Sequence, residues 1–474
     1  MPSSSDQYWK EHYFGAPGQT EIHPGALLAL CLAVLLLFVL PRRYAFIPLL
    51  AAAVFIPPQQ VVIVFSLHLT LTRILIGCAW LRLLWTRFVQ QGPALPLWQS
   101  LDTVMVACYT TGIVTFFLLW GEGGAIVNRL GLLYNALGIY FFMRYILRDA
   151  RDLDRLAKTL AWVMVVIATF MLVEQSTGRN LFSVFGGVTE FTEIRDGKLR
   201  SQGPFAHPLT AGAVGATLFP LMIGLWWQGR KTRRKNKTVA LLGAVAAGVM
   251  AVTSMTSTSL VVLAAGIFAL CMWPLRRFLP WFRWGTVAAL IALHMVMKAP
   301  VWALIARIDL TGSSSSYHRY QLVDQFIRRF GEWWLVGTRN TVNWGWDMWD
   351  TINSYVAAGT DGGLIGFVLF VAILVVAFRR LGIARTAWAV EPEHERRLWV
   401  LGTVLFAHAV AFFGIGYFDQ SSFLWYAELA MIATAVSLRR TVQESARVSD
   451  GSLLAPLKEP QPAVVVDAGP VLVR

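Results

Sequence analysis

The chain has 474 residues, of which 56% are hydrophobic and only 14% are charged, and its formal net charge is +14. Because a soluble domain carries about 25% charged residues, this composition excludes a protein whose whole surface faces water. The surplus of Lys and Arg lies in short runs between apolar segments, as orientation in a membrane requires, so we expect no nucleic-acid partner.

Apolar runs recur along the chain at roughly the 20-residue length that crosses a bilayer. We predict an all-α, polytopic helical membrane protein with about 12 or 13 spans, the second of which is short and bounded by proline. The candidate spans lie at 24–40, 44–57, 62–84, 102–120, 127–146, 157–175, 207–227, 238–256, 258–274, 284–300, 356–378, 398–415 and 423–438.

The Lys and Arg residues predict the orientation of these spans. With thirteen spans the basic runs all fall on one face, which the positive-inside rule makes cytoplasmic. This gives three parts: an N-terminal extracytoplasmic segment (1–23), a single transmembrane helical domain (24–438) and a cytoplasmic, largely disordered tail (439–474).

The four cysteines predict neither disulfides nor a metal site. All of them lie in apolar stretches, and the chain contains no Cys-x-x-Cys pair. They are Cys31, Cys78, Cys108 and Cys271.

Two long hydrophilic segments, 177–206 and 301–355, both fall on the outer face. Since a turn between spans needs only a few residues, loops of this length are where recognition or chemistry is expected. They contain amphipathic helices by their pattern: Leu322, Phe326 and Phe330 recur at helical spacing.

Tryptophan is concentrated in the second of these segments, where five occur within the seventeen residues from Trp333 to Trp349. One interpretation is an aromatic belt at the lipid–water interface. The other is a sugar-binding surface, because aromatic faces stack on pyranose rings while Asp and Asn bond the hydroxyls. The sequence leaves both open.

Two arginines stand out as ligands for an anion. Arg200 lies just outside a span beside a Gly-Pro turn, where it could face a phosphate or extend to lipid head groups. Arg73 lies deeper within an apolar stretch, and intramembrane ionisable residues are functional candidates by default. Other polar residues within predicted spans are His68, His294, Lys298, Asp361 and His408.

Three segments in order resemble the O-antigen ligase and polysaccharide polymerase superfamily of bacterial membrane glycosyltransferases. Arg200–Pro208 looks like the family's Arg-x-x-Gly-x-Phe-x-x-Pro segment, and Arg319 with Gly337 is similar to its arginine-led helix and glycine turn. Asn353-Ser354-Tyr355, followed by a Gly-Leu-x-Gly helix start, resembles its third motif. The likeness covers roughly residues 200–378.

The sequence departs from this family at two positions. Ile352 stands where the family commonly has a histidine before the asparagine, and Ser257-Thr258-Ser259 replaces a Ser-Arg turn. Because the resemblance makes that histidine the activator of the acceptor in ligases, its loss favours a polymerase-like member.

The resemblance implies a metal-independent enzyme without a cofactor in the bacterial inner membrane, with its C-terminus cytoplasmic. Its donor would be a polyprenyl-pyrophosphate-linked oligosaccharide, transferred to a hydroxyl during assembly of a cell-surface polysaccharide such as exopolysaccharide. Besides the lipid bilayer, a chain-length regulator would be a further partner of this cell-envelope enzyme.

The resemblance also implies roles for particular residues. Arg200, Arg319 and Arg73 would bind the pyrophosphate, since guanidinium groups stabilise the departing charge. Asp350, Asp347 or His318 would be the catalytic base. Glycan-binding residues would be Trp344, Trp346, Asn353 and Tyr355.

Two other classes of function remain open. One is a transporter or flippase for lipid-linked sugars, which usually shows internal repeats; we find none. The other is a non-catalytic membrane protein of polysaccharide assembly that binds a glycan without cleaving it.

Overall fold

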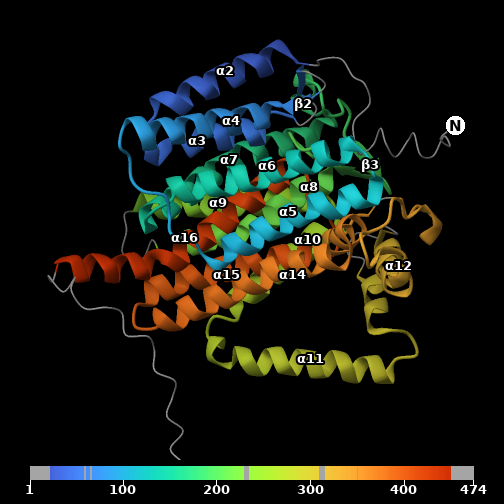
Figure 1. Cartoon of the computed structure of the whole chain (residues 1–474). Helices are drawn as coiled ribbons and strands as arrows, with labels where there is room; N and C mark the ends of the chain where they lie inside the picture. The colour runs from blue at the N-terminus through green and yellow to red at the C-terminus, as the bar shows by residue number, and fades with distance from the viewer. Residues whose placement is uncertain are drawn as a thin grey trace, which may run out of the picture. The chain divides into compact units, whose positions relative to one another are not determined.

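The computed structural model describes residues 22–57, 60–64, 67–228, 234–308, 315–349 and 351–449. The chain divides into two units, Met1–Val436 and Ser437–Arg474. The first unit is a bundle of α-helices with two short β-hairpins (Figure 1). The all-α prediction is therefore confirmed for the described residues.

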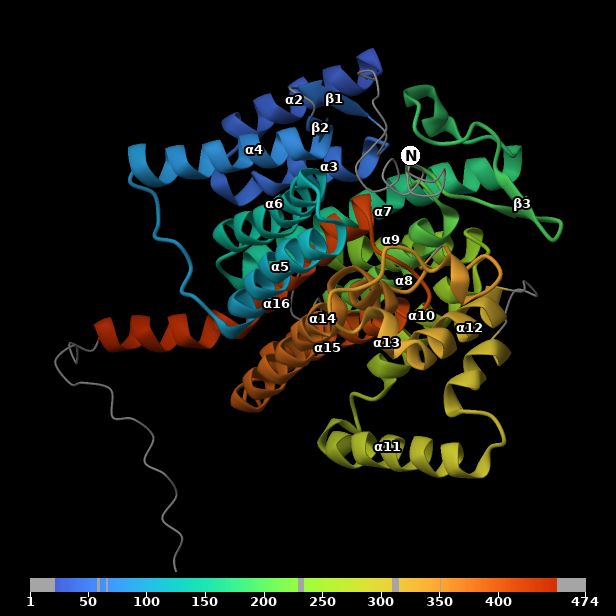
Figure 2. The ribbon, with the colours of Figure 1, turned by 45° about the vertical axis from the view of Figure 1, so that its right-hand side comes forward.

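The longer helices follow the chain as a series of neighbouring rods, seen from a second direction in Figure 2. They are α2 (Pro24–Val39), α3 (Phe46–Phe55), α4 (Leu71–Leu84), α5 (Ser100–Trp120), α6 (Gly123–Ile146), α7 (Ala150–Thr177), α8 (Pro208–Gln228), α9 (Arg234–Thr253), α10 (Ser257–Cys271), α11 (Leu279–Val296), α12 (Ser315–Arg328), α14 (Ser354–Ala387), α15 (Pro392–Ala411) and α16 (Asp419–Ser449).

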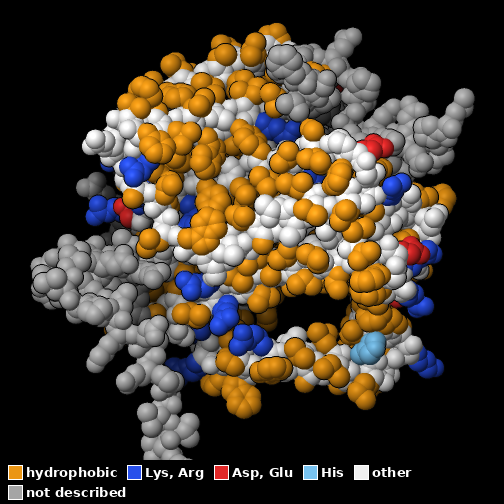
Figure 3. Space-filling model, in the orientation of Figure 1, with side chains coloured by type: hydrophobic (Ala, Val, Ile, Leu, Met, Phe, Trp, Pro, Cys, Tyr) orange, Lys and Arg blue, Asp and Glu red, His pale blue; other side chains and the backbone are white. Residues whose placement is uncertain are grey.

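Within the described residues, eight helices are long and apolar enough to cross a membrane, and α2 and α10 are shorter apolar helices. Hydrophobic side chains also cover much of the outer face of the bundle (Figure 3). Since such a surface requires a hydrocarbon solvent, the chain is a multi-pass membrane protein.

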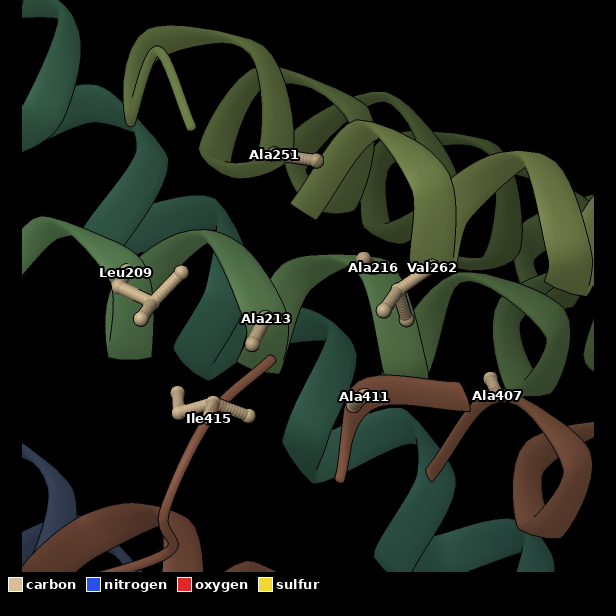
Figure 4. Close-up of a cluster of buried hydrophobic side chains, with 8 residues drawn as sticks. All are labelled: Leu209, Ala213, Ala216, Ala251, Val262, Ala407, Ala411 and Ile415. Atoms are coloured by element: carbon tan, nitrogen blue, oxygen red, sulfur yellow. The ribbon is translucent and has the colours of Figure 1, made fainter. Parts of the chain in front are cut away.

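Helix α8 lies at the centre of the bundle, where 83% of its apolar window is buried. Small residues let neighbouring helices approach closely, and α8 carries several, including Ala213 and Ala216. Figure 4 shows the resulting core, to which α8, α9, α10, α15 and the segment after α15 contribute. Its residues are Leu209, Ala213, Ala216, Ala251, Val262, Ala407, Ala411 and Ile415.

One predicted span is wrong in its first half. Residues 62–84 are helical only from Leu71, because Val61–Val64 (β1) and Leu67–Thr70 (β2) pair as an antiparallel hairpin. The run Val61-Val62-Ile63-Val64 consists of β-branched residues, which fit a strand better than a helix. The Thr70 side chain then caps the N-terminus of α4.

The predicted amphipathic helix exists as α12, and its apolar face packs against protein. Leu322 and Phe326 are buried in a cluster with Trp333 and Trp344. The rings of Phe326 and Trp333 stack with centroids 3.9 Å apart, while Trp346 is 90% exposed. The tryptophans therefore divide between a packed core and an exposed rim.

The remaining short elements connect these helices. They are the 3-10 helices Arg42–Tyr44, Leu181–Phe185, Arg276–Phe278, Val301–Arg307 and Val342–Trp344, the π-helix Trp85–Val89, the four-residue helix α13 (Phe330–Trp333) and a second hairpin of β3 (Glu193–Arg195) and β4 (Lys198–Arg200).

Helix α11 stands apart from the other helices of the first unit. None of its apolar window is buried, and Figure 3 shows an open gap between it and the bundle. Its contacts with protein are limited to the segments at its two ends, so hydrocarbon must cover its sides.

Two glycines join α13 to α14. Gly337 has φ +105° and Gly363, which interrupts α14, has φ +63°, a conformation that favours glycine. Leu364 N donates to Trp334 O at 2.7 Å and Thr338 N to Thr360 O at 2.8 Å. The two segments are thus held together by their backbones.

We predict that Gly337→Ala lowers the free energy of unfolding by about 1–3 kcal/mol, through left-handed backbone strain and overpacking. A Cβ at position 337 would lie 2.1 Å from Thr360 O. Thermal unfolding of the protein in detergent measures the loss. Gly331→Ala is the matched control, because a Cβ there meets no atom within 4 Å; equal midpoints for both variants would contradict the prediction.

Candidate functional site

The segment between α15 and α16, residues 412–420, is where the three family-like segments meet. Its backbone accepts hydrogen bonds from the start of α14: Ser354 N donates to Phe412 O at 2.9 Å and Ser354 Oγ to Ile415 O at 2.8 Å. Asn353 Nδ2 donates to Phe413 O at 3.2 Å. We call residues 412–420 the α15–α16 link.

Asn353 and Tyr355 are therefore occupied in holding helix ends. The Asn353 side chain accepts from the backbone N–H groups of Tyr355 and Val356 and so caps α14. The Tyr355 hydroxyl donates to Ala409 O at 2.8 Å, near the end of α15. Their predicted glycan contacts stay predictions, but their polar atoms already bond the protein.

Arg319 reaches the link from α12. A Cβ placed on Gly414 would lie 3.2 Å from Arg319 Nε and 2.8 Å from Thr258 Oγ1. The side chain of Arg319 and the turn before α10 therefore both pack on Gly414. Only a residue without a side chain allows this approach.

The Arg200–Pro208 segment reaches the same region from the other side. Gln420 Nε2 donates to Pro204 O at 2.9 Å, and Ser201 N donates to Thr253 O at the end of α9 at 3.1 Å. Arg200 itself is buried and forms an ion pair with Glu193, with Nη1 2.5 Å from Oε1. Its predicted anion therefore has an internal competitor.

Glu174, near the end of α7, fixes the turn of this segment. Gly203 N donates to Glu174 Oε2 at 2.8 Å, and Gln202 N donates to Oε1 at 3.1 Å. Thr192 Oγ1 also donates to Oε1, at 3.3 Å. A carboxylate that is 1% exposed and bonded by three donors is an anchor rather than a free acid.

His207 lies directly before α8, close to both charged groups of this segment. Burial, followed by the positive charge of Arg200, lowers the pKa of His207. Its Nδ1 accepts from Leu209 N at 3.0 Å. At neutral pH the imidazole is therefore uncharged, and the positive charge beside Glu193 belongs to Arg200.

A cavity of about 430 Å³ borders the α15–α16 link. Its walls come from α3, α4, α5, α6, α14 and the start of α16, together with Phe412 and Gly416–Gln420 of the link. The size suits a small polar group rather than a long glycan.

Four charged side chains line this cavity: Arg73, Arg129, Asp361 and Asp419. Arg129 Nη2 lies 2.8 Å from Asp361 Oδ2, and its guanidinium lies over the Phe116 ring at 3.7 Å from the centroid. Arg73 lies against Gly131 of α6 and interacts with the charge of Asp419.

Of the predicted pyrophosphate ligands, Arg73 lines this cavity, whereas Arg200 and Arg319 do not. The predicted bases are scattered. Asp347 accepts from Trp349 Nε1 at 2.5 Å, His318 has a buried Nε2 with no partner within the described part of the chain, and Asp350 lies outside the described residues.

The predicted glycan-binding tryptophans differ in environment. Trp344 is 2% exposed and donates from Nε1 to Glu332 Oε2 at 3.0 Å, so its ring belongs to the core. Trp346 alone presents an open face.

Three functional candidates escaped the sequence reasoning: Arg129, Glu174 and Glu428. Each is an ionisable residue within or beside an apolar stretch, the signal that selected Arg73 and would have selected them as well.

Comparison with known proteins identifies no relative: no family model matches the chain, and neither does any curated protein.

We predict that Glu174→Gln loosens the Arg200–Pro208 segment, because an amide cannot accept from both Gln202 and Gly203 without turning its NH₂ toward one donor. Hydrogen exchange at residues 200–206 should rise by roughly tenfold, the equivalent of losing one buried charge-assisted bond. Glu190→Gln is the control, since that carboxylate is exposed; the same exchange rates in both variants would refute the anchor.

Proposed function

We propose that this protein is an O-antigen ligase/polymerase-like glycosyltransferase of the bacterial inner membrane. One observation carries the proposal. Segments around Arg200, Arg319 and Asn353, each of which resembles that family, contact the same α15–α16 link, which also borders a charged cavity. The contacts bring together what the sequence separates by more than a hundred residues.

The donor in this proposal is a glycan on polyprenyl pyrophosphate. Its lipid tail stays in the bilayer, while its diphosphate requires cations in a site of low dielectric. Arg73 and Arg129 supply such groups from the cavity wall, and Arg319 supplies another beside Gly414. Guanidinium suits the task because it offers parallel donors to phosphate oxygens.

The reaction requires no metal and no cofactor. An acceptor hydroxyl attacks the anomeric carbon, the bond from that carbon to the phosphate oxygen breaks, and the electron pair leaves with the pyrophosphate. Arginines stabilise the developing charge. The base remains to be assigned among groups such as Asp347, Asp350 and His318.

The environment of Ile352 supports a polymerase rather than a ligase. Ile352 packs against the apolar core of α8, α9, α10 and α15. No titratable group therefore stands where ligases of the family hold their histidine. A chain-length regulator remains a proposed partner.

A flippase for lipid-linked sugars is the second candidate, and the ion pair of Arg129 with Asp361 favours it. Charge pairs between membrane helices are typical of transport pathways. The site of accumulation separates the two: loss of a polymerase leaves single repeat units outside the membrane, and loss of a flippase leaves them inside. A non-catalytic assembly protein would bind lipid-linked glycan without cleaving it.

We predict that Arg319→Ala reduces polymer formation by at least about a hundredfold, the loss expected when a transition-state donor is removed. Polymer is measured by gel electrophoresis of surface glycan at equal protein level. Arg328→Ala is the matched control on the same helix, since its side chain is 65% exposed. Polymer of wild-type length and amount in the Arg319 variant would refute the clamp.

A further inference from the structure

A histidine and a glutamate are buried together between α15 and α16, beside the cavity. His408 Nε2 is hydrogen-bonded to Glu428 Oε2, and both residues are 2% exposed. On the other side of the ring, His408 Nδ1 lies 2.6 Å from the Tyr417 hydroxyl. The three side chains therefore form one continuous chain of hydrogen bonds.

The pair is an expensive way to join two helices. A buried ion pair contributes little net stability compared with apolar packing, and every other pair of residues in the nearby core is apolar or small. Glu428 Oε1 moreover has no hydrogen-bond partner within the described part of the chain. A buried carboxylate with a free lone pair retains capacity for charge or for a proton.

This chain ends at the cavity. Tyr417 lines the cavity, as do Phe412 and Trp425, and the rings of all three pack around the imidazole. The aromatic rings exclude water from His408. The Tyr417 hydroxyl is then the polar connection from the buried pair toward a group in the cavity.

The chain also lies near the position of the family's histidine. Ile352 and Tyr417 pack against the same apolar core. A protein that lacks an imidazole at position 352 thus holds a different one, His408, behind a tyrosine in the same neighbourhood.

We propose that Tyr417, His408 and Glu428 form the proton-accepting relay for glycosyl transfer, an inference that rests on the proposed function. The acceptor O–H bond breaks as its oxygen bonds the anomeric carbon, and the bond from that carbon to the pyrophosphate oxygen breaks with its electron pair. Tyr417 takes the acceptor's proton while passing its own to His408 Nδ1. The imidazolium formed is stabilised by the Glu428 carboxylate.

In this scheme Tyr417 faces the acceptor, and His408 and Glu428 are positioning residues that act through it. Tyr355 is the nearest further titratable group, because its hydroxyl donates to Ala409 O, one residue after His408. Its hydroxyl is committed to that carbonyl, so the pH response is assigned to the His408–Glu428 pair.

The test uses full-length protein in lipid nanodiscs, with the lipid-linked glycan that accumulates in cells lacking this protein as donor. Tyr417→Phe and Glu428→Gln should each lower kcat by on the order of a hundredfold, the contribution of one general base, with KM for the donor unchanged. Glu428→Gln should also shift the acidic limb of the kcat–pH profile, a response that a packing defect does not produce.

Glu395→Gln is the matched control, since Glu395 is a buried carboxylate of α15 paired with Arg276, away from the cavity; its kcat and pH profile should stay those of the wild type. Wild-type kcat in Tyr417→Phe or Glu428→Gln, or a loss with an unchanged pH profile, overturns the relay while the transferase stands. Absence of accumulated donor, or of transfer by the wild-type protein, overturns both.

Discussion

A backbone carbonyl that loses its helical partner inside an apolar domain must find another donor, and this constraint shapes the region around the end of α15. The carbonyls of Ala409, Phe412, Phe413 and Ile415 are met by Tyr355, Ser354 and Asn353. The start of one membrane helix is thereby locked to the end of another. Because the locked segment also forms a wall of the cavity, the geometry of the candidate site follows from these hydrogen bonds.

The polar groups of this membrane domain serve two different purposes. Some, such as Glu174, are saturated with backbone donors and hold a loop in one conformation. Others, such as Arg129 and Glu428, are only partly satisfied within the described residues, with Arg129 Nε and Glu428 Oε1 still available. Only groups of the second kind can respond to an incoming substrate, since a saturated group would first have to give up its bonds.

Much of the fold could be predicted from the sequence because apolar length is a strong signal. The hairpin of β1 and β2 escaped because Val61–Val64 is as apolar as a helix and only its β-branching distinguishes it. The candidate site was predicted less well. Arg73 was recognised as an intramembrane charge, but no local pattern reveals that Asn353 and Tyr355 spend their polar atoms on α15 and the link, or that Trp344 is buried. Such facts depend on contacts between distant segments.

The isolation of α11 has a mechanical consequence. A helix whose flanks touch acyl chains instead of neighbouring helices takes its tilt from the thickness of the surrounding bilayer. Membranes of different acyl length would therefore move α11 while the packed helices around α8 keep their arrangement. Through Val301–Arg307, which packs against α12, such a displacement would be felt at the base of the helix that carries Arg319. Lipid composition would in this way become an input to the protein.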